Sequence, residues 1–110
     1  MIFLIEEKDL NIEDKITVLY FYASWMPFHK KFISMFAKIE LLYKNILCYG
    51  INVNDFKSLC VKYNVNSIPE VIIIKNKQEI KRINGLILFS ALKSAFNDIF
   101  KNKEQCNEKC

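Results

Sequence analysis

The chain has 110 residues, of which 52% are hydrophobic, and it carries a formal net charge of +4. A chain of this length and apolar content predicts one domain that fills its core without disulfides, which excludes a disordered or low-complexity protein. Arg82 is the only arginine. Because proteins that read nucleic acids rely on arginine for base edges and phosphates, we expect the lysines to be solvated and no nucleic acid to bind.

The N-terminal stretch MIFLI is too short for the apolar centre of a secretory signal, because it runs directly into Glu6 and Glu7. No window approaches the roughly 18 uninterrupted apolar residues that a membrane-spanning helix needs. We therefore expect a soluble cytoplasmic protein that does not bind a membrane. In that compartment its cysteines stay mostly reduced.

The first half of the chain predicts two strands and the best-defined helix. Residues 2–5 form a short apolar run, residues 6–14 are polar with room for a helical turn, and Ile16–Ala23 predicts a strand buried on both faces. Apolar residues then recur at steps of three and four, which predicts a helix. Its stripe consists of Phe28, Phe32, Met35, Phe36, Ile39, Leu42 and Tyr43. Pro27 is expected at the first helical position, with Ser24 as the cap.

The third strand and second helix follow. Residues 45–53 predict a buried strand, and residues 54–65 predict a short helix capped by Asn54 or Asp55. One face of that helix carries the apolar residues Phe56, Leu59, Cys60 and Tyr63. Alternation of strands with helices indicates a sheet that is covered on both faces.

The last part of the chain predicts a hairpin and a helix. The strands Val71–Lys75 and Glu79–Ile83 are expected to pair antiparallel about the turn Asn76-Lys77, with Gly85 ending the hairpin. Residues 86–100 predict a helix, with Leu88, Leu92, Ala95, Phe96 and Ile99 on its apolar side.

The apolar pattern is lost near the C-terminus. We expect one domain over residues 1–101 and a polar, flexible tail over residues 102–110. The order of elements predicts an α/β fold with a mixed sheet.

The local motifs resemble those of the thioredoxin family over roughly residues 2–100. The segment VLYFYASW, a four-residue turn and Lys30 are similar to the active-site segment of that family, and INVNDFKSLCVKYNVNSIPEVIIIKN is similar to its second half. The resemblance implies a thioredoxin-like fold, with a central mixed sheet of four to five strands flanked by helices on both faces. It also implies a cis proline at Ile68-Pro69 and a glycine at Gly85 before the last helix.

The resemblance also implies a shallow apolar groove that holds an extended peptide or a protein partner. Its residues in this chain are Trp25, Met26, Pro27, Phe28, His29, Ile68 and Pro69. Methionine suits adaptable contacts, so Met26 is expected to enlarge the soft apolar surface of the groove.

The departures from the family concern its chemistry. Met26 and His29 stand where the family has its nucleophilic and resolving cysteines, Tyr20 where it has a buried aspartate, and Glu70 where threonine is common. Disulfide exchange needs a thiolate that attacks and a second thiol that resolves the mixed disulfide. Methionine and histidine supply neither, so these positions carry no dithiol chemistry. Without a nucleophile beside them, Tyr20 and Glu70 are not assigned as an acid/base pair.

Other site chemistries have weaker support. Met26 and His29 suit Cu(I), but two ligands at one helix start are too few, so we expect no metal and no cofactor. A neutral His29 that hydrogen-bonds a partner is the alternative, because a helix N-terminus disfavours imidazolium. Cys48 and Cys60 fit structural positions in the core.

The two C-terminal cysteines leave three possibilities open. Cys106 and Cys110 lie four residues apart in the polar segment CNEKC, and could be a redox pair, half of a metal site or an attachment point. Two hypotheses of function follow. The first is a redox-silent module that binds a peptide or protein at the former active-site groove. The alternative is a thiol-disulfide oxidoreductase or redox sensor that works through Cys106 and Cys110.

Overall fold

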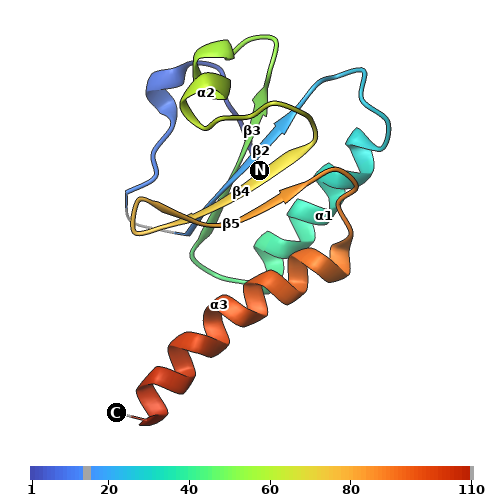
Figure 1. Ribbon diagram of the computed structural model, residues 1–110. Coiled ribbons are helices and arrows are strands. Elements are labelled where there is room, and N and C mark those ends of the chain that lie inside the picture. The colour runs from blue at the N-terminus through green and yellow to red at the C-terminus, as the bar shows by residue number, and fades with distance from the viewer. Residues whose placement is uncertain (14–15, 110) are drawn as a thin grey trace.

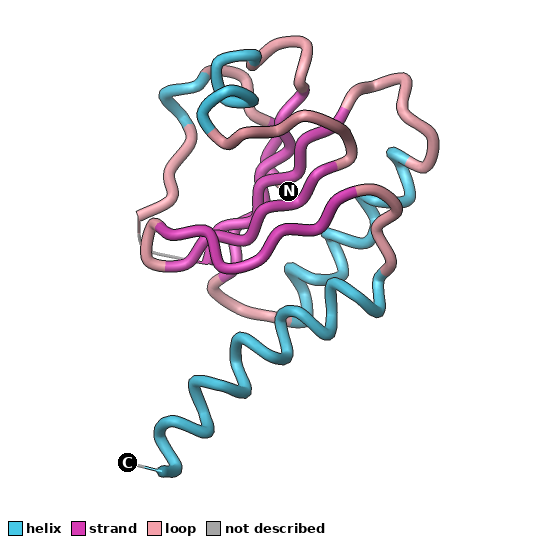
Figure 2. Tube along the Cα trace, in the orientation of Figure 1, coloured by secondary structure: helices cyan, strands magenta, loops and turns pink. Residues whose placement is uncertain are grey.

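The computed structural model describes residues 1–13 and 16–109, with their side chains as far as residue 100. The described residues form one five-stranded sheet in the order β1-β3-β2-β4-β5 (Figures 1 and 2). The strands are β1 (Ile2–Phe3), β2 (Ile16–Tyr22), β3 (Ile46–Asn52), β4 (Glu70–Lys75) and β5 (Gln78–Asn84). β1 and β2 pair parallel with β3, while β4 pairs antiparallel with both β2 and β5. The predicted mixed sheet is confirmed.

Helices cover both faces of this sheet. α1 (His29–Leu42) and α3 (Phe89–Lys109) lie on one face, and α2 (Lys57–Lys62) with the short 3-10 helix η1 (Glu7–Asp9) lies on the other (Figure 1). Alternate side chains of the central strand β2 therefore enter two different cores. Tyr20 packs with Phe36 and Phe96 on the α1/α3 face, whereas Phe21 packs with Phe56 and Leu59 on the α2 face.

The start of α1 differs from the prediction. The helix begins at His29, and Phe28 precedes it in a left-handed conformation with a φ of 65°. This conformation interrupts the helix upstream, so Pro27 is not the first helical residue and Ser24 does not cap the helix. The segment forms a turn instead, in which the N–H of Met26 donates to the carbonyl of Ala23 at 3.0 Å.

The start of α2 also differs from the prediction. Phe56 occupies the N-cap position, and neither Asn54 nor Asp55 provides a side-chain cap. The side chain of Asn52 organises this turn instead, because its Oδ1 accepts from the N–H of Asn54 at 3.0 Å.

The β4–β5 hairpin forms as expected. Asn76 and Lys77 have φ values of 53° and 66°, so both central residues are left-handed, as the two-residue turns that match strand twist require. Gly85 follows the hairpin with a φ of 85°.

The last helix starts later and continues further than its apolar stripe predicts. Leu88 precedes α3 and is exposed, while Leu92, Ala95 and Phe96 are buried as expected. The α3 backbone runs through the segment predicted to be a tail. The side chain of Cys106, and all of Cys110, lie outside the described residues, so the boundary at residue 101 and the two thiols stay predictions.

Candidate functional site

Three connecting segments meet at one end of the sheet (Figure 1). The register pairs Phe21 with Glu70 and Glu70 with Asn84, so the end of β2, the start of β4 and the end of β5 coincide. The N–H of Gly85 donates to the carbonyl of Pro69 at 3.1 Å, which joins two of the segments directly. The residues that follow β2, precede β4 and follow β5 are therefore neighbours in space, as the groove expectation requires.

Large apolar side chains are exposed on these segments. Trp25 is 73% exposed and Phe28 is 61% exposed, and Leu86 and Leu88 after β5 are 67% and 52% exposed. We call these four residues the loop surface. Exposed apolar side chains that gather at one end of a domain indicate a contact site more strongly than single exposed ones do. Leu86 and Leu88 were not predicted to belong to this surface, because a helical stripe placed Leu88 in the core.

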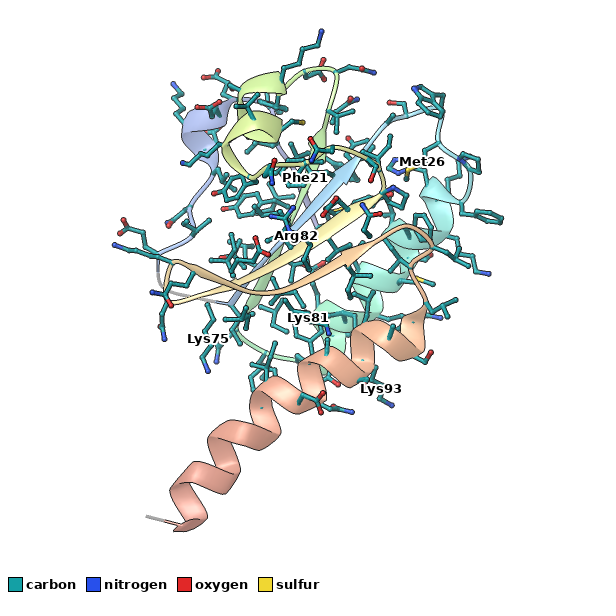
Figure 3. The ribbon with its side chains drawn as sticks, viewed as in Figure 1. Phe21, Met26, Lys75, Lys81, Arg82 and Lys93 are labelled. Carbon is teal, nitrogen blue, oxygen red and sulfur yellow. The ribbon has the colours of Figure 1, made fainter. Side chains whose placement is uncertain are left out.

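Met26 does not belong to the exposed surface. It is only 7% exposed and belongs to the core cluster on the α1/α3 face of the sheet, together with Ile87. Figure 3 shows Met26 at the loop end of the sheet, close to the start of α1. The expectation that Met26 enlarges the contact surface is therefore wrong. The physical reason is alternation: in the segments after β2 and β5, one apolar residue turns inward and its neighbours turn outward.

The remaining predicted groove residues lie partly at the surface. Pro27 is exposed, while His29, Ile68 and Pro69 are half-buried. The Ile68-Pro69 peptide bond is cis, as the resemblance implies. Ile68 packs against both cores, so only part of it remains available to a partner.

Phe28 has an unusual backbone for its residue type. Left-handed φ values are uncommon outside glycine, asparagine and aspartate, and a bulky residue there is an outlier. Among the residues that the structure describes, the other left-handed ones besides Phe28 and Gly85 are three asparagines and Lys77 in a hairpin turn. A large, mostly exposed ring on a strained backbone does little for the core. Strain of this kind gathers at functional sites.

The side chains of Tyr20 and His29 form a hydrogen bond with each other. The hydroxyl of Tyr20 lies 2.9 Å from Nδ1 of His29. The imidazole also stacks on Tyr22, with ring centroids 4.4 Å apart and an interplanar angle of 16°. Burial lowers the pKa of His29 and raises the pKa of Tyr20. The polar partner of the buried Tyr20 hydroxyl is thus His29, the residue that stands where the family has its resolving cysteine.

Glu70 lies on the opposite face of the sheet from Tyr20, because it pairs with Phe21 and shares its face. Its carboxylate is buried and is fully engaged. Nη1 of Arg82 is 3.0 Å from Oε1, and Nδ2 of Asn84 donates to Oε2 at 2.7 Å. The sheet separates Glu70 from Tyr20, so the two residues do not act as an acid/base pair.

The two described cysteines show no sign of activation. Cys48 is buried in β3, and burial raises the pKa of its thiol to about 12. Burial also raises the pKa of Cys60 on α2, where Cys60, Val65 and Ile68 line a small hollow. Thiols of this kind are inert, because the thiolate is the reactive form. Across the described residues, no three His, Cys, Asp or Glu side chains gather in a way that could hold a metal ion.

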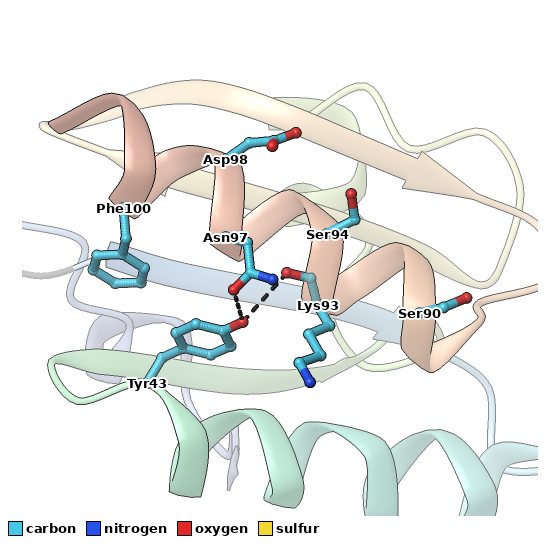
Figure 4. A pocket seen from close by; sticks show the side chains of 7 residues that line it. All are labelled: Tyr43, Ser90, Lys93, Ser94, Asn97, Asp98 and Phe100. Carbon is cyan, nitrogen blue, oxygen red and sulfur yellow. Dashed lines mark hydrogen bonds between the residues drawn. The ribbon is translucent and has the colours of Figure 1, made fainter. Parts of the chain in front are cut away.

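A second hollow lies away from the loop surface, between the end of α1 and α3 (Figure 4). It has a volume of about 900 Å³. The Tyr43 hydroxyl at its edge reaches the carbonyl of Lys93 at 3.3 Å and the side-chain oxygen of Asn97. The Tyr43 ring stacks on Phe100 and packs on Phe96. These contacts dock α3 onto the end of α1, so we assign this hollow a structural role.

The comparisons with known proteins agree with this architecture. The family profile "Thioredoxin" matches residues 6–98. The chain is 30% identical to Thioredoxin-1 of Caenorhabditis elegans over 74 aligned residues, and these residues cover 67% of this chain and 64% of that protein. Over 78 residues it is 27% identical to Thioredoxin H5 of Arabidopsis thaliana, covering 71% and 66% of the two chains. The chain thus spans slightly less than two thirds of the length of these relatives.

Solved structures share the fold. A mutant thioredoxin from Halobacterium salinarum superposes with a TM-score of 0.77 at 16% identity, covering 88% of both chains. Thioredoxin-2 of the malaria parasite superposes with a TM-score of 0.72 at 26% identity, covering 81% of this chain and 87% of that one. No helix in the described part of the chain is both long and apolar enough to cross a membrane. By its sequence match and its architecture, the chain belongs to the thioredoxin family.

Proposed function

We propose that this chain is a redox-silent member of the thioredoxin family that binds an extended peptide, or an extended segment of a partner protein, at the loop surface. The observation that carries the proposal is the pair Trp25 and Phe28, both mostly exposed, with Phe28 held on a strained backbone. Aromatic side chains at protein interfaces supply much of the binding energy, because they bury a large area at a small cost in conformational entropy.

The chemistry of the neighbouring residues supports the redox-silent part of the proposal. The residues between Ser24 and Lys30 include no cysteine. Position 26 holds a buried thioether and position 29 an imidazole bonded to Tyr20. Neither group attacks or resolves a disulfide. The site therefore offers shape and apolar surface for binding.

Binding can be tested with a phage-displayed library of random peptides, selected on the wild-type protein and followed by synthesis of the enriched peptides. We expect Trp25→Ala to weaken the affinity by about 30-fold, which corresponds to a hot-spot loss of roughly 2 kcal/mol. Pro69→Ala is expected to weaken it as well. Val61→Ala is the matched control, because Val61 is an 82% exposed apolar residue on α2. Equal affinities for wild type, Trp25→Ala and Pro69→Ala would refute the proposal.

Phe28 allows binding and stability to be separated. Phe28→Gly removes an exposed ring and relieves the left-handed strain, so we expect the free energy of unfolding to rise or stay within about 1 kcal/mol of wild type. Peptide affinity should fall at the same time. A loss of stability without a loss of affinity would instead assign the ring to the core.

The hypothesis that the protein is a thiol-disulfide oxidoreductase has its own test. Reduction of insulin by dithiothreitol is expected to proceed at the uncatalysed rate with the wild-type protein. The alternative that Cys106 and Cys110 carry oxidoreductase activity requires a faster rate that Cys106→Ser abolishes. The double variant Met26→Cys/His29→Cys tests whether the frame still supports dithiol chemistry once both thiols are restored.

A further inference from the structure

The bond between Tyr20 and His29 fixes the protonation pattern of the imidazole. Tyr20 is fully buried, and His29 Nδ1 is the partner that the described residues offer to its hydroxyl. A buried phenol that cannot donate its proton loses a hydrogen bond at considerable cost. If Nδ1 carried a proton, it would compete with the phenol as a donor. The Tyr20 O–H therefore donates to an unprotonated Nδ1, and the neutral imidazole carries its proton on Nε2.

The second ring nitrogen is available to a partner. Among the described residues, each buried side-chain nitrogen and oxygen has a hydrogen-bond partner, and His29 makes its one hydrogen bond through Nδ1. Nε2 is therefore open to solvent. Its ring is held by the stack on Tyr22. His29 follows the exposed Phe28 directly in the sequence and precedes the exposed Lys30, so this donor belongs to a residue next to the loop surface in the chain.

The surroundings favour an uncharged acceptor. The titratable neighbours in ring contact with the imidazole are the two tyrosines of β2, Tyr20 and Tyr22. Asp55 acts electrostatically on Tyr22, whose pKa is raised by burial first and by this carboxylate second. Trp25 and Phe28 add apolar surface next to it in the chain. A carboxylate placed there would lose its hydration against a neutral donor, whereas a peptide carbonyl loses much less.

We propose that His29, positioned by Tyr20, donates its Nε2–H to a main-chain carbonyl of the bound peptide, so that the partner presents an uncharged extended segment to the loop surface. This inference rests on the proposed function, since it concerns the same site. Tyr20 acts through His29 and is a positioning residue.

The tautomer can be measured without any partner. His29 is the only histidine in the chain, so the ring signals of uniformly ¹⁵N-labelled protein belong to it without further assignment. Above about pH 7 we expect a pyridine-type shift for Nδ1 and a pyrrole-type shift for Nε2. In Tyr20→Phe the two shifts should move toward those of a freely exchanging imidazole. A pyrrole-type Nδ1 in the wild type would overturn the inference.

The hydrogen bond to the partner is tested with a peptide selected from the random library on the wild-type protein. His29→Phe keeps an aromatic ring but has no donor, and we expect about fivefold weaker binding, the value of one neutral hydrogen bond. His29→Gln keeps a donor and should recover part of the loss. Affinity in His29→Phe equal to that of wild type overturns the inference, while the proposed function stands if Trp25→Ala still weakens binding.

The pH profile distinguishes a carbonyl from a carboxylate. A neutral peptide that covers His29 lowers the pKa of the imidazole further, so by linkage the affinity falls as the pH drops below about 6.5. Binding of a carboxylate would favour imidazolium, and the affinity would rise over the same range. A rise that His29→Gln abolishes overturns the inference. Failure of the library to yield any peptide overturns the proposed function, and this inference with it, whatever the tautomer.

Discussion

Two polar clusters lie at the loop end of the sheet, on opposite faces of it. On the α2 face, the buried Glu70 is held by Arg82 and Asn84. Arg82 also donates to the carbonyl of Tyr63 at 2.7 Å and to Glu79. On the α1/α3 face, Tyr20 and His29 form a neutral pair.

The two clusters differ in whether they leave a hydrogen-bonding group available to a partner. In the charged cluster, the donors of Arg82 and Asn84 and the carboxylate of Glu70 all bond to partners within the protein. These bonds connect β5 of the hairpin to the start of β4 and to the loop before it. The neutral pair satisfies the buried hydroxyl and leaves one donor at the surface. Buried charge without a full set of partners is costly, whereas a neutral donor can stay free at little cost. One cluster therefore stabilises the end of the sheet and the other is suited to recognition.

The largest effect is expected in the charged cluster. Arg82→Ala leaves Glu70 buried with Asn84 as its remaining partner, and removes the bonds to the backbone before β4. We expect the free energy of unfolding to fall by about 3 kcal/mol in a urea titration. Lys81→Ala, on the neighbouring exposed position of β5, is the matched control. A loss below about 1 kcal/mol would show that the cluster is not a stabilising element.

The neutral pair should matter less for stability. Tyr20→Phe removes one neutral hydrogen bond between a buried phenol and the half-buried His29, so we expect a loss of about 1 kcal/mol. Tyr22→Phe is the matched control, because no hydrogen bond of the Tyr22 hydroxyl is found among the described residues. If the two variants lose the same free energy of unfolding, the Tyr20–His29 bond contributes nothing measurable.

The pH dependence of stability tests the same pair through the protonation of His29. Burial lowers the pKa of His29 in the folded state below its ordinary value of about 6.5. The unfolded chain therefore binds a proton first as the pH falls. Stability is fully present above about pH 6.5 and decreases as the pH drops toward the lower folded-state pKa. We expect urea midpoints of wild type to fall between about pH 7.5 and pH 5.5 relative to those of His29→Gln. Parallel midpoints would contradict the shift.

The smallest effect is expected at the exposed edge of the charged cluster. Hydrogen bonds from Arg82 lower the pKa of Glu79, but Glu79 is solvent-accessible and Arg82 retains Glu70 as a partner. Glu79→Gln should therefore cost no more than a few tenths of a kcal/mol in the urea titration. A loss that approaches the one for Arg82→Ala would mean that the exposed carboxylate, and not Glu70, holds the guanidinium.

Local patterns predicted most of the secondary structure because each pattern has a direct physical cause. The continuous apolar run of Ile16–Ala23 indicated a strand that is buried on both faces, and the steps of three and four after Phe28 indicated α1. The beginnings of the helices were less predictable. Pro27 and Ser24 suited a helix start by residue type, but the left-handed backbone of Phe28 delays the start of α1 to His29, after both residues. Residue preferences do not reveal a single strained backbone angle.

The site was predictable only in part. Trp25, Phe28 and Pro69 were expected at one surface from the family resemblance, and the strand register brings their segments together. The exposure of Leu86 and Leu88 and the burial of Met26 were not expected. Their hydrophobicity alone favours the core, and which of them turn inward depends on how the segments after β2 and β5 cross the end of the sheet.

The sequence by itself determined the fold class, the alternation of strands and helices, and the absence of a thiol at positions 26 and 29. These follow from residue type and short-range spacing. The tertiary structure decided which side chains meet: Tyr20 with His29 on one face, and Glu70 with Arg82 on the other. The physical reason is that successive residues of a strand point to opposite faces, so the partner of each side chain is set by sheet pairing and helix packing between segments far apart in the chain.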